Sequence, residues 1–340
     1  MIDSLWETEC PNMTSHALPN QIVLDRACGN YIYCQKGEKY LDLCAGFGSL
    51  SLGHQPDDLK EIFADFLDEK RPAPILQGLG EIFPTSDKIL FLQKLTNILP
   101  FPKAKGIIAL SGSQAIESAL KTMILHTGKS GVICLKDCYH GIDIGTLPLT
   151  YRESFRTLFD KHILNKNVIH IPEHCSQSVI EEAIADLQAR DCGFAGILAE
   201  PVQSRVGVKV IDQDWLRLLG ETAHKNQGLF VLDEIYTGFG RTGSLTISDH
   251  VGADLTCLGK ALGGGLPLSV CVGTSQVMDS WPVNKSEAVH GGTFFAHPLS
   301  LKLAIKVIER FEESGLHSHI EDTSAWLFDL LYQSQLNYEC

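Results

Sequence analysis

The sequence predicts an α/β fold with a largely parallel sheet covered by helices. Short apolar runs alternate with stretches of helical periodicity along the middle of the chain, a pattern typical of α/β domains. Several of these runs are apolar throughout, as strands buried on both faces should be. Seven strands are predicted, at Gly106–Leu110, Gly131–Leu135, Val168–Ile171, Gly196–Ala199, Leu229–Leu232, Leu255–Leu258 and Val270–Val272.

Helical spacing between these strands supports the same fold class. In two stretches the apolar residues recur three and four positions apart, so each forms a stripe that can pack on a sheet. The stripes consist of Ile116, Ala119, Leu120, Met123 and Ile124, and of Trp215, Leu218, Leu219 and Thr222. Outside this region we predict a hairpin over Asn30–Leu43, a helix over Asp58–Lys70 and an amphipathic helix at Leu301–Phe311.

The composition is that of a globular protein with one large or two modest domains. The chain has 340 residues, 44% hydrophobic and 20% charged, with a formal net charge of −13. This charge argues against binding to nucleic acid or to an anionic membrane, because both need basic patches. No apolar run approaches the roughly 20 residues of a membrane span, and the first residues do not resemble a signal peptide. A cytoplasmic location is therefore expected.

The cysteines and histidines predict neither disulfides nor a metal site. The eleven cysteines include no Cys-x-x-Cys pair, so we expect reduced and mostly buried thiols. His170 and His174 are four residues apart, but Pro172 prevents a helix from joining them. We expect no bound metal.

Five segments follow predicted strands and could meet at the carboxyl edge of the sheet, where open α/β sheets bind ligands. The first, Ser111-Gly112-Ser113, comes just before the first predicted helix. Glycine lets a ligand approach the backbone, and the free N–H groups of a helix start can bind phosphate. The same residues also suit an ordinary capped helix without a ligand.

Two further strands are followed by Tyr139-His140-Gly141 and by Glu200-Pro201. The ring of Tyr139 could stack on a planar cofactor, with glycine leaving room beside it, although a packed surface tyrosine would have the same sequence. An acid and a proline at the end of a strand mark either the edge of a site or an ordinary turn.

Asp233 and Glu234 end the next strand and are followed by a glycine-rich segment. Gly238–Gly243 matches Gly-x-Gly-x-x-Gly, but its glycines do not directly follow the strand and the residues after it do not start a helix. Gly128-Lys129-Ser130 lacks the upstream glycine of a P-loop. Neither a nicotinamide site nor a nucleotide P-loop is therefore predicted.

Lys260 lies just past another predicted strand and is followed closely by three glycines, Gly263–Gly265. An amine at one strand end and the Asp233 carboxylate at a neighbouring one suit an enzyme that forms a Schiff base, where the acid keeps a pyridinium nitrogen charged. A solvated loop lysine is the alternative. Gly291–Phe294, further along the chain, offers a possible second contact for a phosphate.

Taken together and in this order, these segments resemble the class III aminotransferases, pyridoxal-phosphate enzymes of the aspartate-aminotransferase fold (fold type I). Asp233–Gly243 and Lys260–Gly265 carry the resemblance most specifically. It implies a large domain with a mostly parallel seven-stranded sheet between helices, and a small domain formed by both ends of the chain. The implied division is 1–75 for the N-terminal part of the small domain, 76–297 for the large cofactor-binding domain and 298–340 for the start of the C-terminal small domain.

The resemblance also implies roles for individual residues. Lys260 would form the Schiff base with pyridoxal phosphate and later shuttle a proton, and Asp233 would keep the ring nitrogen protonated. Thr293 would reach the phosphate of the neighbouring subunit, because sites in this family lie at a homodimer interface. The implied cofactor-binding set is Gly112, Ser113 (phosphate), Tyr139 and Ile235 (the two ring faces), His140, Glu200 (substrate side), Asp233, Lys260 and Thr293.

Departures from the family pattern bear on the substrate. Ornithine-type members have an arginine directly after the glycine that corresponds to Gly141, where this chain has Ile142. This difference argues against an ornithine or acetylornithine substrate and favours transfer between an amine or ω-amino acid and a 2-oxo acid. An aminomutase or racemase of the same family, similar to the glutamate-semialdehyde mutases, stays open as an alternative. Tyr236 stands where many relatives have a glutamine. Arg152, Arg156 and Arg205 are candidate partners for a substrate carboxylate.

The end of the sequence is the largest departure. Family members continue beyond the position of Cys340 into a C-terminal subdomain, so the resemblance implies a short small domain. A helix over Thr323–Leu331 would then have exposed apolar residues. A catalytically silent partner subunit is therefore a third hypothesis.

Overall fold

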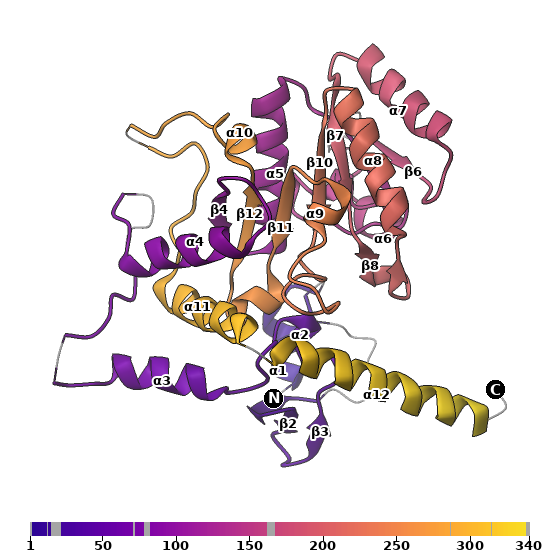
Figure 1. Cartoon of the computed structure of the whole chain (residues 1–340). Helices are drawn as coiled ribbons and strands as arrows, with labels where there is room; N and C mark the ends of the chain where they lie inside the picture. Colours follow the sequence, from indigo (N-terminus) through magenta and orange to yellow (C-terminus); the bar gives the residue numbers. More distant parts are fainter. Residues whose placement is uncertain are drawn as a thin grey trace.

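A seven-stranded sheet forms the centre of the molecule (Figure 1). This computed structural model describes residues 2–11, 13–14, 22–70, 72–77, 82–161, 167–285, 287–313 and 315–337. In spatial order the strands are β4 (Lys105–Ala109), β12 (Ser269–Gly273), β11 (Leu255–Leu258), β10 (Leu229–Asp233), β7 (Phe194–Ala199), β5 (Gly131–Leu135) and β6 (Val168–Ile171). Strand β12 is antiparallel to both neighbours, and the other pairs are parallel. The predicted sheet is confirmed.

Helices cover both faces of this sheet. The main helices that pack on the sheet are α5 (Gly112–Thr127), α7 (Gln177–Ala189) and α8 (Gln213–Lys225). A side chain at Gly196 on β7 would meet Met123 of α5 at 2.7 Å, whereas Phe230 on β10 lies 2.9 Å from the place of a side chain at Gly220 of α8. Gly196 pairs with the residue before Phe230. Because successive strand residues point to opposite faces, α5 and α8 lie on opposite sides of the sheet.

A second apolar core lies beside the β4–β12 edge of the sheet. It joins α4 (Ser86–Ile98) and α11 (Pro298–Glu312). Phe91 and Leu95 of α4 and Leu301 and Ile308 of α11 are fully buried in it. The predicted amphipathic helix is thus confirmed as α11, whereas α4 was not among the predicted helices.

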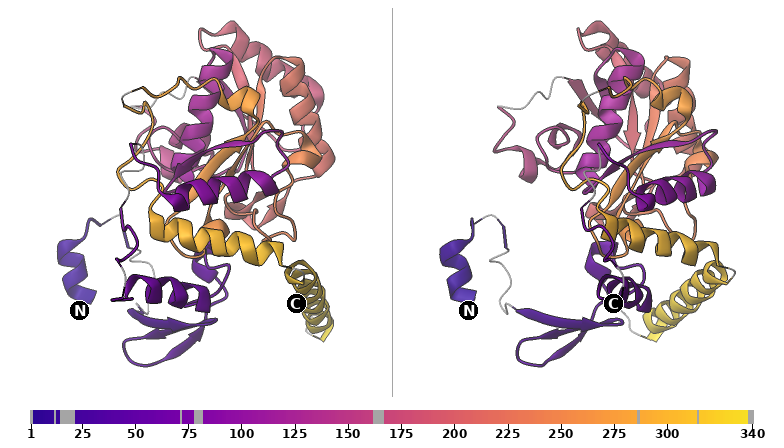
Figure 2. Two further views of the ribbon diagram at one scale, coloured as in Figure 1. Left: turned by 60° about the vertical axis from the view of Figure 1, so that its left-hand side comes forward. Right: turned by 90° about the vertical axis from the view of Figure 1, so that its left-hand side faces the viewer.

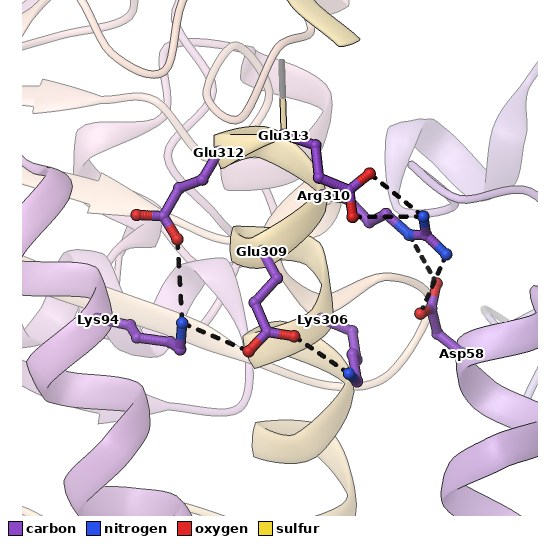
Figure 3. A network of polar contacts seen from close by, with 7 residues as sticks. All are labelled: Asp58, Lys94, Lys306, Glu309, Arg310, Glu312 and Glu313. Carbon is purple, nitrogen blue, oxygen red and sulfur yellow. Dashed lines mark hydrogen bonds and ion pairs between the residues drawn. The ribbon is translucent and has the colours of Figure 1, made fainter. Parts of the chain in front are cut away.

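Charged residues connect α11 to α4 and to α3 (Asp57–Phe66), as Figure 3 shows. Lys94 Nζ lies 3.3 Å from a carboxylate oxygen of Glu309, and Arg310 Nε lies 3.2 Å from one of Asp58. Helix α3 is the helix predicted at Asp58–Lys70, and it ends at Phe66, four residues earlier than expected. These contacts attach the N-terminal helix α3 to the C-terminal helix α11.

Besides the N-terminal helix α1 (Ile2–Thr8), two parts of the chain project from the body (Figure 2). One is the antiparallel sheet of β1 (Leu24–Cys28), β2 (Tyr31–Cys34) and β3 (Lys39–Leu41), which contains the predicted hairpin. The other is α12 (Leu316–Asn337), which includes the helix predicted at Thr323–Leu331. Its Trp326 and Phe328 are 62% and 71% exposed, so the expected exposure of apolar residues is confirmed.

The remaining α-helices and strands of the described ranges are short. They are α2 (Ala45–Gly48), α6 (Glu153–Arg156), β8 (Val202–Gln203), β9 (Lys209–Val210), α9 (Ser248–Val251) and α10 (Ser275–Met278). Across the described ranges, no helix combines the length and the apolar character that a membrane crossing requires.

Candidate active site

The carboxyl ends of β4, β5, β7, β10 and β11 lie around a cavity of about 450 Å³. These strands run in one direction, so their carboxyl ends share one edge of the sheet, where α/β folds bind ligands. Residues from all five predicted segments line the cavity. Of the predicted set it is lined by Gly112, Ser113, Tyr139, His140, Glu200, Asp233, Ile235 and Lys260.

Asp233, the last residue of β10, forms a buried pair with His140. His140 Nδ1 lies 2.8 Å from Asp233 Oδ2, and both residues are buried. The backbone N–H of Ile235 donates to the other carboxylate oxygen at 3.2 Å. Burial opposes the charged form of His140, but Cys138 and the hydrogen bond to Asp233 outweigh burial and raise the pKa of His140 well above its ordinary value. The cavity therefore contains a carboxylate whose position is fixed from two sides.

Lys260 follows β11 and brings an amine to the same cavity. Burial lowers the pKa of Lys260, although the charges of Asp233 and Glu200 act in the opposite direction. A lowered pKa leaves more of the amine uncharged and able to attack a carbonyl carbon. Lys260 Nζ lies 5.3 Å from the ring centre of Tyr236, so this tyrosine is beside the amine.

The N-terminus of α5 opens onto the cavity at Gly112 and Ser113. Ser111 caps the helix, since its Oγ accepts a hydrogen bond from the N–H of Gln114 at 3.3 Å. A side chain at Gly141 would lie only 2.2 Å from Ser113 Oγ, so glycine is needed there for the chain to pass the helix start. The helix start offers free N–H groups and a partial positive charge to an anion.

Glu200, directly after β7, holds Tyr139 in place. Its Oε1 accepts a hydrogen bond from the Tyr139 N–H at 2.8 Å. Burial, the largest cause, raises the pKa of Glu200 to about 8. The ring of Tyr139 packs edge-on against Phe155 with 5.7 Å between ring centres. Backbone and ring are thus both fixed beside the cavity.

Thr293 is the predicted site residue that does not line the cavity. Its carbonyl accepts a hydrogen bond from Gln77 Nε2 at 2.7 Å. Its contact with the phosphate site of a neighbouring subunit stays a prediction.

Glu234 follows Asp233 but belongs to a separate buried network. Its carboxylate accepts hydrogen bonds from the hydroxyls of Thr246 and Ser248 and from the N–H of Ile247. These bonds tie the loop after Gly238–Gly243 to the sheet. Inside Gly238–Gly243 the N–H of Phe239 donates to the carbonyl of Leu245 at 3.0 Å. The glycines therefore belong to a closed loop and do not start a helix.

Phe47 and Ser49 also line the cavity and were not predicted. They belong to a turn in which residues 45–48 all have positive φ, including 46° at Ala45 and 56° at Phe47. Such a left-handed turn is unfavourable outside glycine and is found at functional sites. The Gly-x-Gly around Phe47 was the available signal, but it does not reveal that the turn lies beside strand ends more than 60 residues away in sequence.

Both the sequence and the fold are similar to those of known proteins. The family model for class III aminotransferases matches residues 13–340. An acetylornithine aminotransferase of Archaeoglobus fulgidus is 29% identical over 87% of this chain and 74% of its own length. A [LysW]-aminoadipate semialdehyde/glutamate semialdehyde transaminase of Sulfurisphaera tokodaii is 32% identical over 80% of the chain and 66% of its own length. A diaminobutyrate–2-oxoglutarate transaminase of Wolinella succinogenes is 30% identical over 90% and 72%.

Solved structures agree in fold. An amine transaminase from an uncultivated Pseudomonas species, in its PLP-bound form, has a TM-score of 0.84 at 24% identity and covers 97% of this chain and 80% of its own. The ornithine aminotransferase of Toxoplasma gondii has a TM-score of 0.82 at 23% identity, with coverage of 98% and 76%. The predicted fold type is confirmed.

The cavity fits pyridoxal phosphate, the cofactor of this family. The cofactor needs an amine for its carbonyl, an anion for its ring nitrogen and a binding place for its phosphate. Lys260, the buried Asp233 and the uncovered start of α5 supply these three groups in one cavity. Over the part of the chain that the structure describes, no cluster of residues could hold a metal ion.

Proposed function

We propose that this chain, which belongs to the class III aminotransferase family, transfers an amino group between an amine or ω-amino acid and a 2-oxo acid. The observation that carries the proposal is the shared cavity of Lys260 and Asp233, with Asp233 held by His140 at 2.8 Å. Bound pyridoxal phosphate supplies an electron sink for the carbon that loses its proton.

Each residue then has a defined task. Asp233 would hold a proton on the ring nitrogen of the cofactor by its charge, and His140 fixes the orientation of that carboxylate. The amine of Lys260 would hold the cofactor covalently, and the same amine would carry a proton to and from the substrate carbon. Gly112 and Ser113 would bind the phosphate of the cofactor at the start of α5. Tyr139 and Ile235 would cover the two faces of the cofactor ring, and Glu200 would lie on the substrate side.

The wider setting is part of the same proposal. A homodimer would place Thr293 at the neighbouring subunit's phosphate, and residues 76–297 would form the large domain. A cytoplasmic location remains a prediction from the sequence. Curated relatives include an acetylornithine aminotransferase. The absence of an arginine after Gly141 argues against acetylornithine as a substrate of this chain. The amino donor therefore has to be found by experiment.

The test is the visible absorbance of the purified protein with pyridoxal phosphate. We expect a band from the lysine-bound cofactor in the wild type and in Lys225→Ala, an exposed lysine whose Nζ is 3.7 Å from Glu181. Lys260→Ala should lose the band. An unchanged band in Lys260→Ala, or no band in the wild type, would contradict the proposal.

A single-turnover reaction with an amino donor alone separates the possible reactions. A transaminase releases one equivalent of the oxo product without a second substrate, whereas a racemase or a mutase releases none. A protein that binds the cofactor but reacts with no donor would be the silent subunit.

A further inference from the structure

The structure separates the three arginines that were candidates for binding a substrate carboxylate. Arg205 lines the active-site cavity, whereas Arg152 and Arg156 do not. The Arg152 guanidinium lies 5.4 Å from the ring centre of Phe155, and Arg156 Nε lies 3.9 Å from Asp160. Arg205 is thus the one of the three that a substrate in the cavity can reach.

The backbone around Arg205 is anchored on both sides. The residue lies in a short 3-10 turn (Ser204–Val206) between β8 and β9. Before it, Gln203 Nε2 donates to the carbonyl of Lys136 at the end of β5, at 2.7 Å. After it, Lys209 forms an ion pair with Glu173. These contacts hold the turn at the cavity, so that a guanidinium there is a stable feature of the site.

The guanidinium itself has unused hydrogen-bonding capacity. Its central carbon lies 4.5 Å from the ring centre of Tyr139, the distance of a cation–π contact. No ion pair of Arg205 occurs within the described ranges. Stacking occupies the face of the guanidinium and leaves its edge, with five N–H donors, available to a carboxylate.

The acids of the cavity have other partners. Asp233 is held by His140 and Ile235, and Glu200 accepts the N–H of Tyr139. An incoming anion is therefore the partner that the cavity lacks for Arg205.

We propose that Arg205 binds a carboxylate of the substrate, and that the enzyme therefore acts on carboxylate-bearing donors in preference to simple amines. This inference rests on the proposed aminotransferase function. The carboxylate can be the one next to the reacting carbon or one at the far end of an ω-amino acid. In both cases a planar guanidinium binds it through two parallel hydrogen bonds.

The first experiment measures binding without turnover. Glutarate, an unreactive dicarboxylate, is titrated calorimetrically into the cofactor-loaded wild type, Arg205→Gln and Arg205→Lys. Loss of a charge-assisted pair at an exposed site should weaken glutarate binding about 10- to 100-fold in Arg205→Gln. Arg205→Lys should recover part of the affinity, and Arg152→Gln, whose side chain lies outside the cavity, should bind glutarate as the wild type does.

The second experiment measures specificity as a ratio. In single-turnover reactions, the second-order rate constant for γ-aminobutyrate is compared with that for butylamine, which lacks the carboxylate. Arg205→Gln should lower the ratio of the two values about 10- to 100-fold. Alanine in place of γ-aminobutyrate distinguishes the sources, because only the carboxylate next to the reacting carbon is present there.

The outcomes separate the two proposals. Equal loss for butylamine and γ-aminobutyrate, or no loss for either, would overturn the role of Arg205 while leaving aminotransferase activity established. If the wild type reacts with no donor, the proposed function fails, and glutarate binding still decides whether Arg205 recognises a carboxylate.

Discussion

An aspartate–histidine pair lies at each end of β10, and the two pairs differ in their surroundings. At the carboxyl end Asp233 and His140 lie 2.8 Å apart, with side-chain exposures of 7% and 0%. At the amino end Asp254 and His224 also lie 2.8 Å apart, but the histidine is 44% exposed. Asp254 additionally accepts the N–H of Phe230 at 2.8 Å, which connects the start of β11 to β10.

These surroundings indicate which of the two pairs is structural. The exposed pair costs little desolvation and connects backbone segments, so it can stabilise the fold. The buried pair costs more to desolvate, and His140 Nε2 is buried without a partner in the described part of the molecule. Replacing a buried pair of this kind by apolar residues of similar volume often costs a protein no stability. The carboxyl-end pair is therefore explained by the chemistry of the cavity.

Asp233→Asn and Asp254→Asn should have the largest and most different effects on activity. Asn at 233 keeps the shape but cannot hold a proton on the cofactor ring by charge, so kcat should fall on the order of 10²- to 10⁴-fold. Asp254→Asn should change kcat less than about twofold, with its effect on the thermal midpoint instead. Steady-state kinetics and melting curves of both variants provide the measurement. Similar kinetic losses in both would show that the two edges are not functionally different.

Glu200→Gln tests how a buried acid of the cavity makes the stability of the fold depend on pH. Burial raises the pKa of Glu200 to about 8, whereas an unfolded glutamate titrates near 4.3. The folded protein therefore becomes less stable as pH rises from about 4.3 to about 8, since the unfolded state loses the proton first. Because Gln does not titrate, the unfolding free energy of Glu200→Gln relative to that of the wild type should increase over this range. The increase should be on the order of a few kcal/mol and level off above about pH 8.

Urea unfolding of the cofactor-free wild type and Glu200→Gln between pH 5 and 9 measures this difference. Glu182→Gln is the control, because it changes an exposed residue of α7. Glu173→Gln would not serve, because Glu173 is ion-paired with Lys209. A constant difference between wild type and Glu200→Gln across this range would contradict the raised pKa.

The sheet could be predicted from the sequence because its strands are continuously apolar. β5, β10 and β11 are buried on both faces, and the predicted bounds differ from theirs by at most one residue. The helix α4 was missed because its apolar residues are spread around the helix, with only Phe91 and Leu95 fully buried. Periodicity detects a helix with one apolar face and not a helix of this kind.

The site could be predicted only as far as motifs reach. Lys260 and Asp233 lie in segments whose residue types already indicate their chemistry. Phe47 is brought to the cavity by a left-handed turn, and Arg205 becomes distinct from other arginines only by its place beside Tyr139. Such positions depend on tertiary packing, so no local pattern identifies them.

His224→Gln tests the amino-end pair through pH. The hydrogen bond to Asp254 is the main cause that raises the pKa of His224. Its stabilisation is therefore complete below the ordinary histidine pKa of about 6.5 and is lost as pH rises through the raised value. The melting difference between wild type and His224→Gln should shrink from pH 6 to pH 8.5. In an Asp254→Asn background the same substitution should show no such trend, and a trend that persists there would assign it to another group.

Lys306→Ala tests an ion pair between two partly exposed charges of one helix. Lys306 Nζ lies 3.1 Å from Glu309 on the same helix, within the network of Figure 3, with side-chain exposures of 38% and 36%. An i,i+3 pair at the surface contributes about 0.2–0.5 kcal/mol and is screened by salt. The variant should therefore lose less than about 0.5 kcal/mol of unfolding free energy at 0.05 M salt. At about 1 M salt the loss should vanish, since the screening length is then near 3 Å. A loss above about 1.5 kcal/mol, unaffected by salt, would mean that exposure does not distinguish the structural charges of this fold from those of its cavity.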